Sequence, residues 1–209
     1  MTATPHATGI ILYGGTFDPV HHGHLITAQA AREALGAARV LFMPARQNPH
    51  KACVRSAAAA DRLAMLRAAT AGMTEFAVSD LELSRAGPSY TIDTVRTLRQ
   101  AEPAARLVLL LGADQLPTLP MWYEAAALLE LVEPAVLRRP EVDAEAGLAQ
   151  VAARMGAATA ARLRGGLLDT PLVAISATDV RARVAGGRSI RYLVPADVEA
   201  YIQRHKLYL

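Results

Sequence analysis

The chain has 209 residues, of which 52% are hydrophobic and 20% are charged, a composition that suits one globular domain and excludes a disordered segment. The formal net charge is +3, aromatic residues make up only 5%, and the basic residues are scattered, so no nucleic-acid partner is predicted. No apolar run approaches the roughly 18 residues that a membrane span needs, and residues 1–8 lack the pattern of a secretory signal, so no membrane association is predicted.

Short apolar runs alternate with longer amphipathic segments along the first half of the chain. Residues 9–13 predict a buried strand, and a helix is predicted from His22 to Leu35, with Gly36 as its stop. The elements predicted next are a strand at 39–43, a helix at 61–71, a strand at 76–79, a helix at 90–100 and a strand at 107–111. Strands that alternate with helices predict an α/β fold, in which helices cover both faces of a parallel sheet.

The second half of the chain has weaker signals. The alanine-rich stretch 143–164 predicts a peripheral helix, and residues 171–175 predict a last strand. Two helices should follow, one opening at Ser176 and one at Pro195. Without a linker or internal repeat, residues 1–209 are expected to form a single domain with a small C-terminal helical part at about 176–209.

A glycine pair and clustered histidines stand between the first strand and the first helix. Gly14 and Gly15 carry no Cβ, so a phosphate can approach the backbone there. His21 and His24 lie one helical turn apart, so both rings can face one ligand beside the helix N-terminus. Because ligands of parallel α/β sheets bind outside the carboxyl ends of the strands, these residues predict a phosphate site.

Other interpretations of the same segment remain open. Zinc could bind His21, His22 and His24, although neither a cysteine partner nor an H-E-x-x-H pattern accompanies them. The histidines could also be a surface run that caps a helix. The dinucleotide fingerprint G-x-G-x-x-G and the G-K-S/T of a Walker loop are both absent, which disfavours a nicotinamide-dependent dehydrogenase.

The segment from Gly15 to His24 resembles the pattern G-x-F-x-P-x-H-x-G-H of the nucleotidyltransferase superfamily. The resemblance implies a Rossmann-like, doubly wound parallel sheet, with His21 and His24 holding the phosphates of a nucleotide and His22 at the variable position.

A second segment, Ile175 to Arg181, resembles the superfamily pattern I-S-x-T-x-x-R, although Ala177 stands where many members have another serine. Ser176 and Asp179 also form a plain helix-capping arrangement, while a guanidinium one turn into the helix can reach phosphate oxygens. With the first motif, the resemblance implies ATP contacts from Gly14, Gly15, Thr16, Phe17, His21, His24, Gly112, Asp114, Ser176, Thr178 and Arg181.

Three further stretches are similar to bacterial nicotinate-nucleotide adenylyltransferases: P-S-Y-T at 88–91, G-x-D at 112–114 with P-x-W-Y-E at 120–124, and the ending at 192–208. A flat, electron-poor pyridine suits stacking on an indole, although a lone tryptophan also serves core packing. Asn48 to Lys51 resembles the family's P-P-H-K/R loop, with Asn48 in place of a proline and 45–47 departing from the pattern. The resemblance implies mononucleotide contacts from Tyr90, Thr91, Trp122, Tyr123, His50, Lys51 and Arg138.

The implied reaction is adenylyl transfer from ATP to nicotinic acid mononucleotide, which yields deamido-NAD and pyrophosphate in NAD biosynthesis. The acceptor phosphate is already an anionic nucleophile, so alignment and electrostatic stabilisation should suffice without a covalent intermediate. The expected catalytic residues are His21, His24, Lys51 and Arg181. Mg²⁺ should accompany ATP, held mainly by substrate phosphates and water and not by a protein metal site.

Two alternatives share the first motif: a pantetheine-phosphate adenylyltransferase and a non-catalytic nucleotide-binding protein on the same fold. Cys53 is the only cysteine and cannot form an internal disulfide, so the cytoplasm is the expected location. A homo-oligomer is compatible with the sequence.

Overall fold

The computed structural model describes residues 6–46, 56–85 and 89–209, and within them one parallel sheet carries the fold. Its strands are β1 (His6–Gly15), β2 (Ala37–Pro44), β3 (Phe76–Val78), β4 (Arg106–Gly112), β5 (Glu133–Leu137) and β6 (Leu167–Leu168). They are arranged in the order β3-β2-β1-β4-β5-β6, and every pairing is parallel. This order reverses between β1 and β4, as in doubly wound sheets. The predicted fold class is confirmed.

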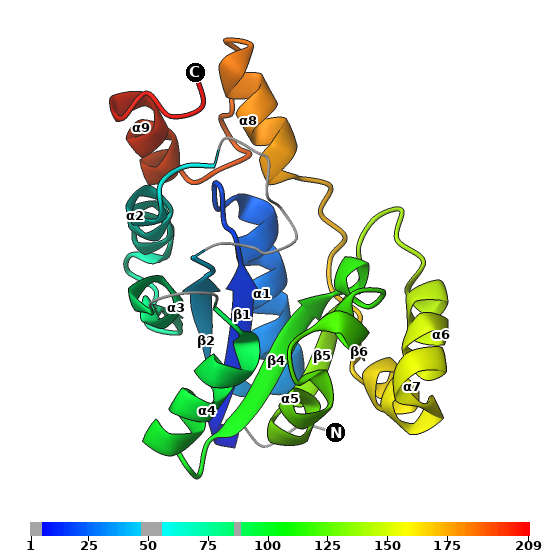
Figure 1. The fold of residues 1–209 in the computed structure, drawn as a ribbon. Helices are drawn as coiled ribbons and strands as arrows, with labels where there is room; N and C mark the ends of the chain where they lie inside the picture. Colours follow the sequence, from blue (N-terminus) through cyan, green and yellow to red (C-terminus); the bar gives the residue numbers. More distant parts are fainter. Residues whose placement is uncertain (1–5, 47–55, 86–88) are drawn as a thin grey trace.

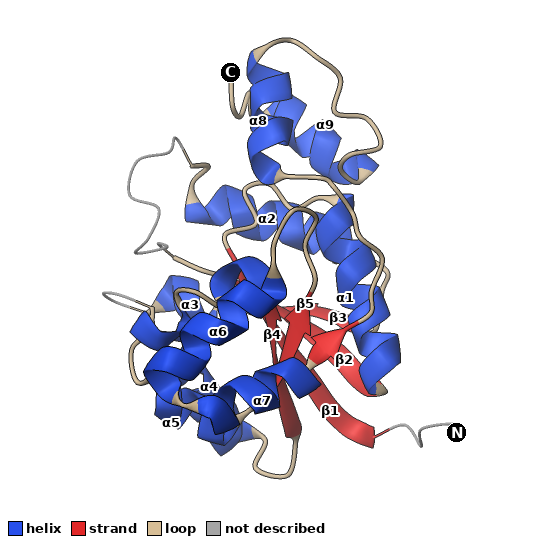
Figure 2. Ribbon diagram, turned by 90° about the vertical axis from the view of Figure 1, so that its right-hand side faces the viewer, coloured by secondary structure: helices blue, strands red, loops and turns tan. Residues whose placement is uncertain are grey.

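Helices cover both faces of this sheet (Figure 2). They are α1 (His22–Leu35), α2 (Ala59–Thr70), α3 (Leu81–Ser84), α4 (Thr91–Ala101), α5 (Ala125–Leu131), α6 (Ala144–Met155), α7 (Ala157–Gly165), α8 (Ala177–Ala185) and α9 (Ala196–Arg204), with 3₁₀ turns η1 (Ala113–Gln115) and η2 (Leu119–Met121). Alternation along β1 divides the core: Ile10 and Leu12 pack with α4 to α7, whereas Ile11 and Tyr13 pack with α1, α2, α8 and α9. The continuous leucine run of β4 therefore reflects a strand buried on both faces.

The predicted last strand at 171–175 is wrong. The segment is not a strand, and Leu172 is 61% exposed, so its apolar residues do not mark a buried element. The sheet instead ends with β6, which follows α7 and pairs Leu167 and Leu168 with Val136 and Leu137 of β5. A two-residue strand has too few positions for a hydrophobic period, and so sequence patterning missed it.

The prediction of one peripheral helix at 143–164 is also wrong. Gly156 adopts a φ of 93°, a conformation that favours glycine, and it separates α6 from α7. Leu148, Val151 and Leu163 are fully buried in the core on the α4 to α7 face. Both helices are therefore part of the packed layer.

The two final helices lie beyond the end of the sheet toward which β1 points (Figure 1). Ser176 caps α8, and Pro195 precedes the first residue of α9, close to the predicted starts. The Tyr201 hydroxyl donates to Asp61 at 2.9 Å and joins α9 to α2. Among the helices of the described ranges, none combines the length and the apolar character needed to cross a bilayer.

Candidate active site

The candidate site lies where β1, β4 and β5 end side by side. Because these strands are parallel neighbours, the residues that follow them meet at one edge of the sheet. At Gly14 an added Cβ would meet nothing within 4 Å, so the end of β1 borders open space. At Gly15 the same atom would lie 2.9 Å from the Phe17 ring. The first glycine thus leaves room for a ligand, and the second makes room for Phe17.

Phe17 packs beneath the site, against aromatic rings of the core and against His24. It adopts a φ of 49° and is buried, with ring centroids 5.5 Å from Tyr13, 5.7 Å from Phe42 and 5.0 Å from His24. A ring so enclosed packs against His24 and exposes little surface to any ligand. Thr16, by contrast, is partly exposed beside the two glycines.

His21 and His24 stack at the start of α1, with ring centroids 3.7 Å apart and an interplanar angle of 24°. The His21 amide donates to His24 Nδ1 at 3.2 Å, so the neutral His24 ring carries its proton on Nε2. His21 Nδ1 is buried and has no hydrogen-bond partner within the described part of the chain. The two rings therefore lie side by side at the start of α1, as the sequence predicted.

Both histidines are neutral at neutral pH. Burial, assisted by the charges of Arg139 and His22, lowers the pKa of His21 from 6.5 to about 3. Burial, followed by His21 and Arg139, also lowers the pKa of His24. They can therefore meet a phosphate as N–H donors. Within the described residues, no three His, Cys, Asp or Glu side chains gather as a metal site, which leaves the zinc interpretation without support.

Arg139, which the sequence interpretation did not select, is a candidate residue of the site. It forms an ion pair with Asp114 at 3.5 Å, and its charge acts on Tyr13 as well as on the two histidines. Arg138, which was predicted to contact the mononucleotide, is exposed, and its charge acts on Glu145 of α6. The alternation of side chains along β5 would have distinguished the two arginines. Ala135 and Leu137 pack on the face of the sheet that carries Tyr13, and the same two-residue spacing directs Arg139 to that face.

The end of β4 positions Asp114 opposite Arg139. A Cβ on Gly112 would lie 2.2 Å from the Asp114 carboxylate, so only glycine leaves this carboxylate in place. The Gly112 amide donates to Gln115 Oε1 at 3.1 Å, which fixes the turn. Asp114 itself remains more than half exposed and accessible to a ligand.

The second motif meets the first through Arg181. Its Nη1 donates to the Asp18 carbonyl at 2.7 Å, and its Nη2 donates to Thr178 Oγ1 at 3.3 Å. Ser176 accepts from the Asp179 amide at 3.0 Å, so the capping arrangement is present. Two segments that lie 163 positions apart are thereby joined at the turn that leads to His21.

Tyr90 and Tyr123 form an aromatic pair, with ring centroids 4.4 Å apart and exposed fractions of 37% and 53%. Arg96 of α4 holds Glu124 through contacts of 3.2 and 2.6 Å, and Glu124 adopts a φ of 49° at the start of α5. Trp122 is partly buried against the core. The structure thus brings Tyr90 and Tyr123, from the two similar stretches, together. Thr91, as the first residue of α4, has an amide without a partner inside the helix.

A buried carboxylate, also missed from sequence, supports the tyrosine segment. Glu82 Oε1 accepts from Thr94 Oγ1 at 3.1 Å, Arg85 donates to the same hydroxyl at 3.2 Å, and Ser89 Oγ donates to the Glu82 carbonyl at 2.9 Å. Burial raises the pKa of Glu82 to about 7. The start of α4 is therefore tied to α3 through buried polar contacts.

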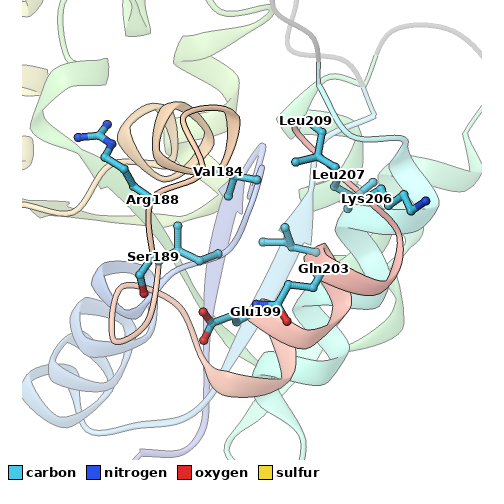
Figure 3. Close-up of a pocket in the computed structure, with 11 residues that line it drawn as sticks. Val184, Arg188, Ser189, Glu199, Gln203, Lys206, Leu207 and Leu209 are labelled. Atoms are coloured by element: carbon cyan, nitrogen blue, oxygen red, sulfur yellow. The ribbon is translucent and has the colours of Figure 1, made fainter.

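Two of the predicted residues, His50 and Lys51, lie outside the described residues. A cavity of about 380 Å³ lies between α8, α9 and the segment that follows (Figure 3). Val184, Ile190 and Leu207 contribute apolar surface to it, and Arg188 and Glu199 are charged residues of its lining. None of its lining residues belongs to the phosphate motifs, and it is separate from the candidate site.

Comparison with known proteins agrees with this geometry. The sequence model of the cytidylyltransferase-like family matches residues 12–183. The probable nicotinate-nucleotide adenylyltransferase of Thermomicrobium roseum is 47% identical over 94% of this chain and 90% of its own length. The corresponding protein of Synechococcus sp. (strain JA-3-3Ab) is 45% identical over 98% and 97%.

A solved structure shares the fold at much lower identity. The Plasmodium falciparum nicotinic acid mononucleotide adenylyltransferase complexed with NaAD has a TM-score of 0.74 and 17% identity, over 96% of this chain and 97% of that one. The extent of the family match and the identity with these relatives leave one conclusion: the chain belongs to the cytidylyltransferase-like family and, within it, to the nicotinate-nucleotide adenylyltransferases.

Proposed function

We propose that the chain transfers AMP from ATP to nicotinic acid mononucleotide, forming deamido-NAD and pyrophosphate in NAD biosynthesis. The observation that carries this proposal is the contact between Arg181 and Asp18, which joins the two nucleotide motifs beside His21 and His24. The named relatives support the choice of acceptor.

In this reaction an oxygen of the acceptor phosphate attacks the α-phosphorus of ATP, and the bond from that phosphorus to the bridging oxygen of pyrophosphate breaks. Charge repulsion between two phosphorylated substrates opposes the attack, so positioned donors and cations should supply most of the catalysis. His21 and His24 are proposed to donate N–H groups to the triphosphate, and Arg139 and Arg181 supply positive charge. Lys51 remains a proposed contact from outside the described residues.

The other nucleotide contacts are proposed along the same edge. Gly14, Gly15, Thr16, Gly112 and Asp114 border ATP, with Ser176 and Thr178 on the far side. The pyridine ring is proposed to lie by Trp122, with Tyr90, Thr91 and Tyr123 near its carboxylate.

A divalent cation, expected to be Mg²⁺, should arrive with ATP and offset charge on the leaving pyrophosphate. The imidazoles and guanidiniums of the site suit phosphate oxygens better than Mg²⁺, which prefers oxygen ligands, and the Asp114 carboxylate is already paired with Arg139. Substrate phosphates and water should therefore hold the ion. We further propose that the enzyme is cytoplasmic and consists of a single domain.

Pyrophosphate release from ATP and Mg²⁺ tests the function, with nicotinic acid mononucleotide, nicotinamide mononucleotide and phosphopantetheine compared side by side. Turnover with nicotinic acid mononucleotide should exceed that with either other acceptor. A preference for phosphopantetheine would support the pantetheine-phosphate alternative. No release with any acceptor would favour a non-catalytic nucleotide-binding protein.

Gly14→Ala tests the phosphate site directly. The folded chain has room for the added methyl group, so thermal stability should change little. A bound phosphate would meet that methyl, and kcat/KM for ATP should fall by at least about tenfold. Gly165→Ala, which also adds a methyl to open space, is the matched control and should leave kcat/KM unchanged. Equal kinetics in the two variants would show that no ligand approaches Gly14.

A further inference from the structure

Asp18 is a buried carboxylate in the turn between β1 and α1, three residues before His21. It is 4% exposed, and its Oδ1 accepts two hydrogen bonds, from the Ala57 amide at 3.0 Å and from the Tyr208 hydroxyl at 2.7 Å. Its Oδ2 lies 3.9 Å from Arg181 Nη1. A charge buried this deeply is costly unless each lone pair finds a partner, so these contacts determine whether the turn keeps its conformation.

A second buried charge holds the same turn from the side of α2. Arg62 is 3% exposed, and its Nη1 donates to the Thr16 carbonyl at 2.7 Å while its Nε donates to the Ala57 carbonyl at 3.3 Å. The turn that leads to His21 is thus held by α2 and α8, and the Tyr208 contact adds a third support.

Tyr208 lies 190 residues after Asp18, in the segment that follows α9. It packs, partly buried, against the same core as Ile11 and Phe17. Burial, followed by the hydrogen bond to Asp18, raises its pKa, so the phenol stays protonated and donates. The adenylyl-transfer scheme assigns no task to this segment, although it contributes a donor to the turn that carries the histidines.

We propose that Tyr208 is a positioning residue of the nucleotide site: its hydroxyl fixes the Asp18 carboxylate, and the turn held in this way places His21 and His24 against the triphosphate. The inference rests on the proposed function, since it assumes that ATP is the ligand of this edge. It concerns ATP and not the acceptor, because the aromatic segments have no contact with Tyr208 among the described hydrogen bonds and ring pairs.

Tyr208→Phe removes the hydroxyl and keeps the ring. The matched control is Tyr201→Phe, because Tyr201 also donates to a carboxylate, that of Asp61, from the same helical part without touching the turn. Loss of a hydrogen bond to a buried charge corresponds to roughly tenfold or more in an equilibrium constant. We therefore expect Tyr208→Phe to raise the KM for ATP about tenfold and to leave the KM for the mononucleotide within about twofold. Tyr201→Phe should leave both within about twofold.

Two results would overturn the proposal. One is an unchanged KM for ATP in Tyr208→Phe. The other is a parallel loss of thermal stability and activity in both variants, which would make Tyr208 a general structural contact. ATP binding measured by calorimetry on the folded proteins gives an independent readout, with the dissociation constant expected to rise about tenfold only in Tyr208→Phe. If the wild-type chain binds ATP but transfers nothing to the mononucleotide, the proposed function fails while this comparison of affinities still tests Tyr208.

Discussion

Acid should lower the stability of the folded chain through His21, the histidine that is proposed to donate to the nucleotide. His21 is neutral when folded, because burial holds its pKa at about 3, whereas in the unfolded chain the ordinary pKa is 6.5. Below the unfolded pKa the unfolded chain binds a proton that the folded chain does not. The free energy of unfolding must therefore fall as the pH drops from 6.5 toward 3.

The size of this effect follows from the two pKa values. Their difference corresponds to about 5 kcal/mol once the pH is below both. At about pH 5 only part of it has developed, and His21 alone should have cost about 2 kcal/mol relative to neutral pH. The lowered pKa of His24 acts in the same direction. Against a typical total of about 5–15 kcal/mol, this loss is easily measured.

Urea unfolding at about pH 7.5 and about pH 5, followed by the fluorescence of Trp122, compares the wild type with His21→Asn. Asparagine is a favourable N-cap for α1 and does not titrate, so this variant should lose about 2 kcal/mol less than the wild type between the two conditions. His205→Asn, at an exposed position, is the control and should lose as much as the wild type. An equal loss in all three proteins would refute a neutral, buried His21.

Two further predictions concern charged side chains of the candidate site. Arg139→Ala should lower kcat/KM for ATP by about 100-fold, because the Arg139 guanidinium lies within electrostatic range of both site histidines. Arg138→Ala should lower kcat/KM by less than about threefold. Steady-state kinetics in which Arg138→Ala has the larger effect would return Arg138 to the candidate site. Glu82 has its pKa raised to about 7, so its ionisation should lower the free energy of unfolding as the pH rises from about 4.5 to 7. Glu82→Gln keeps an acceptor for Thr94. In urea unfolding, its free energy of unfolding should exceed that of the wild type by up to about 3 kcal/mol at about pH 8 and should equal it below about pH 4.5. Parallel pH profiles of the two proteins would contradict this account.

The sequence predicted those elements whose burial repeats along several residues. The leucine run of β4 is apolar at every position because both of its faces are covered, and α1 begins at His22 and ends at Leu35 as the spacing and Gly36 indicated. Strand β6 was not predicted, because its position depends on pairing with β5, which no local sequence pattern encodes. The apolar residues at 171–175 led to a wrong strand prediction, because most of that stretch is exposed and its apolar pattern does not reflect burial.

The site was predictable to the extent that its motifs are contiguous in sequence. His21 and His24 were found together because they lie three positions apart at the start of a helix. The sequence interpretation selected Arg138 and not Arg139, because the choice between these adjacent residues depends on which side of β5 each one faces. Asp18 and Tyr208 could not have been paired from the sequence, since only the folded chain brings these two positions into contact.

That last contact has a consequence for biosynthesis. A ribosome makes residues in order, and Asp18 is made 190 positions before Tyr208, so the turn that carries Asp18 exists long before its tyrosine partner. The sheet can pair β1 with β2 early, but the Asp18 carboxylate gains the hydrogen bond from the Tyr208 hydroxyl only after residue 208 has been made. Nascent chains that stop short of this tyrosine would consequently retain most of the scaffold and lack one of the hydrogen bonds that hold the turn before His21.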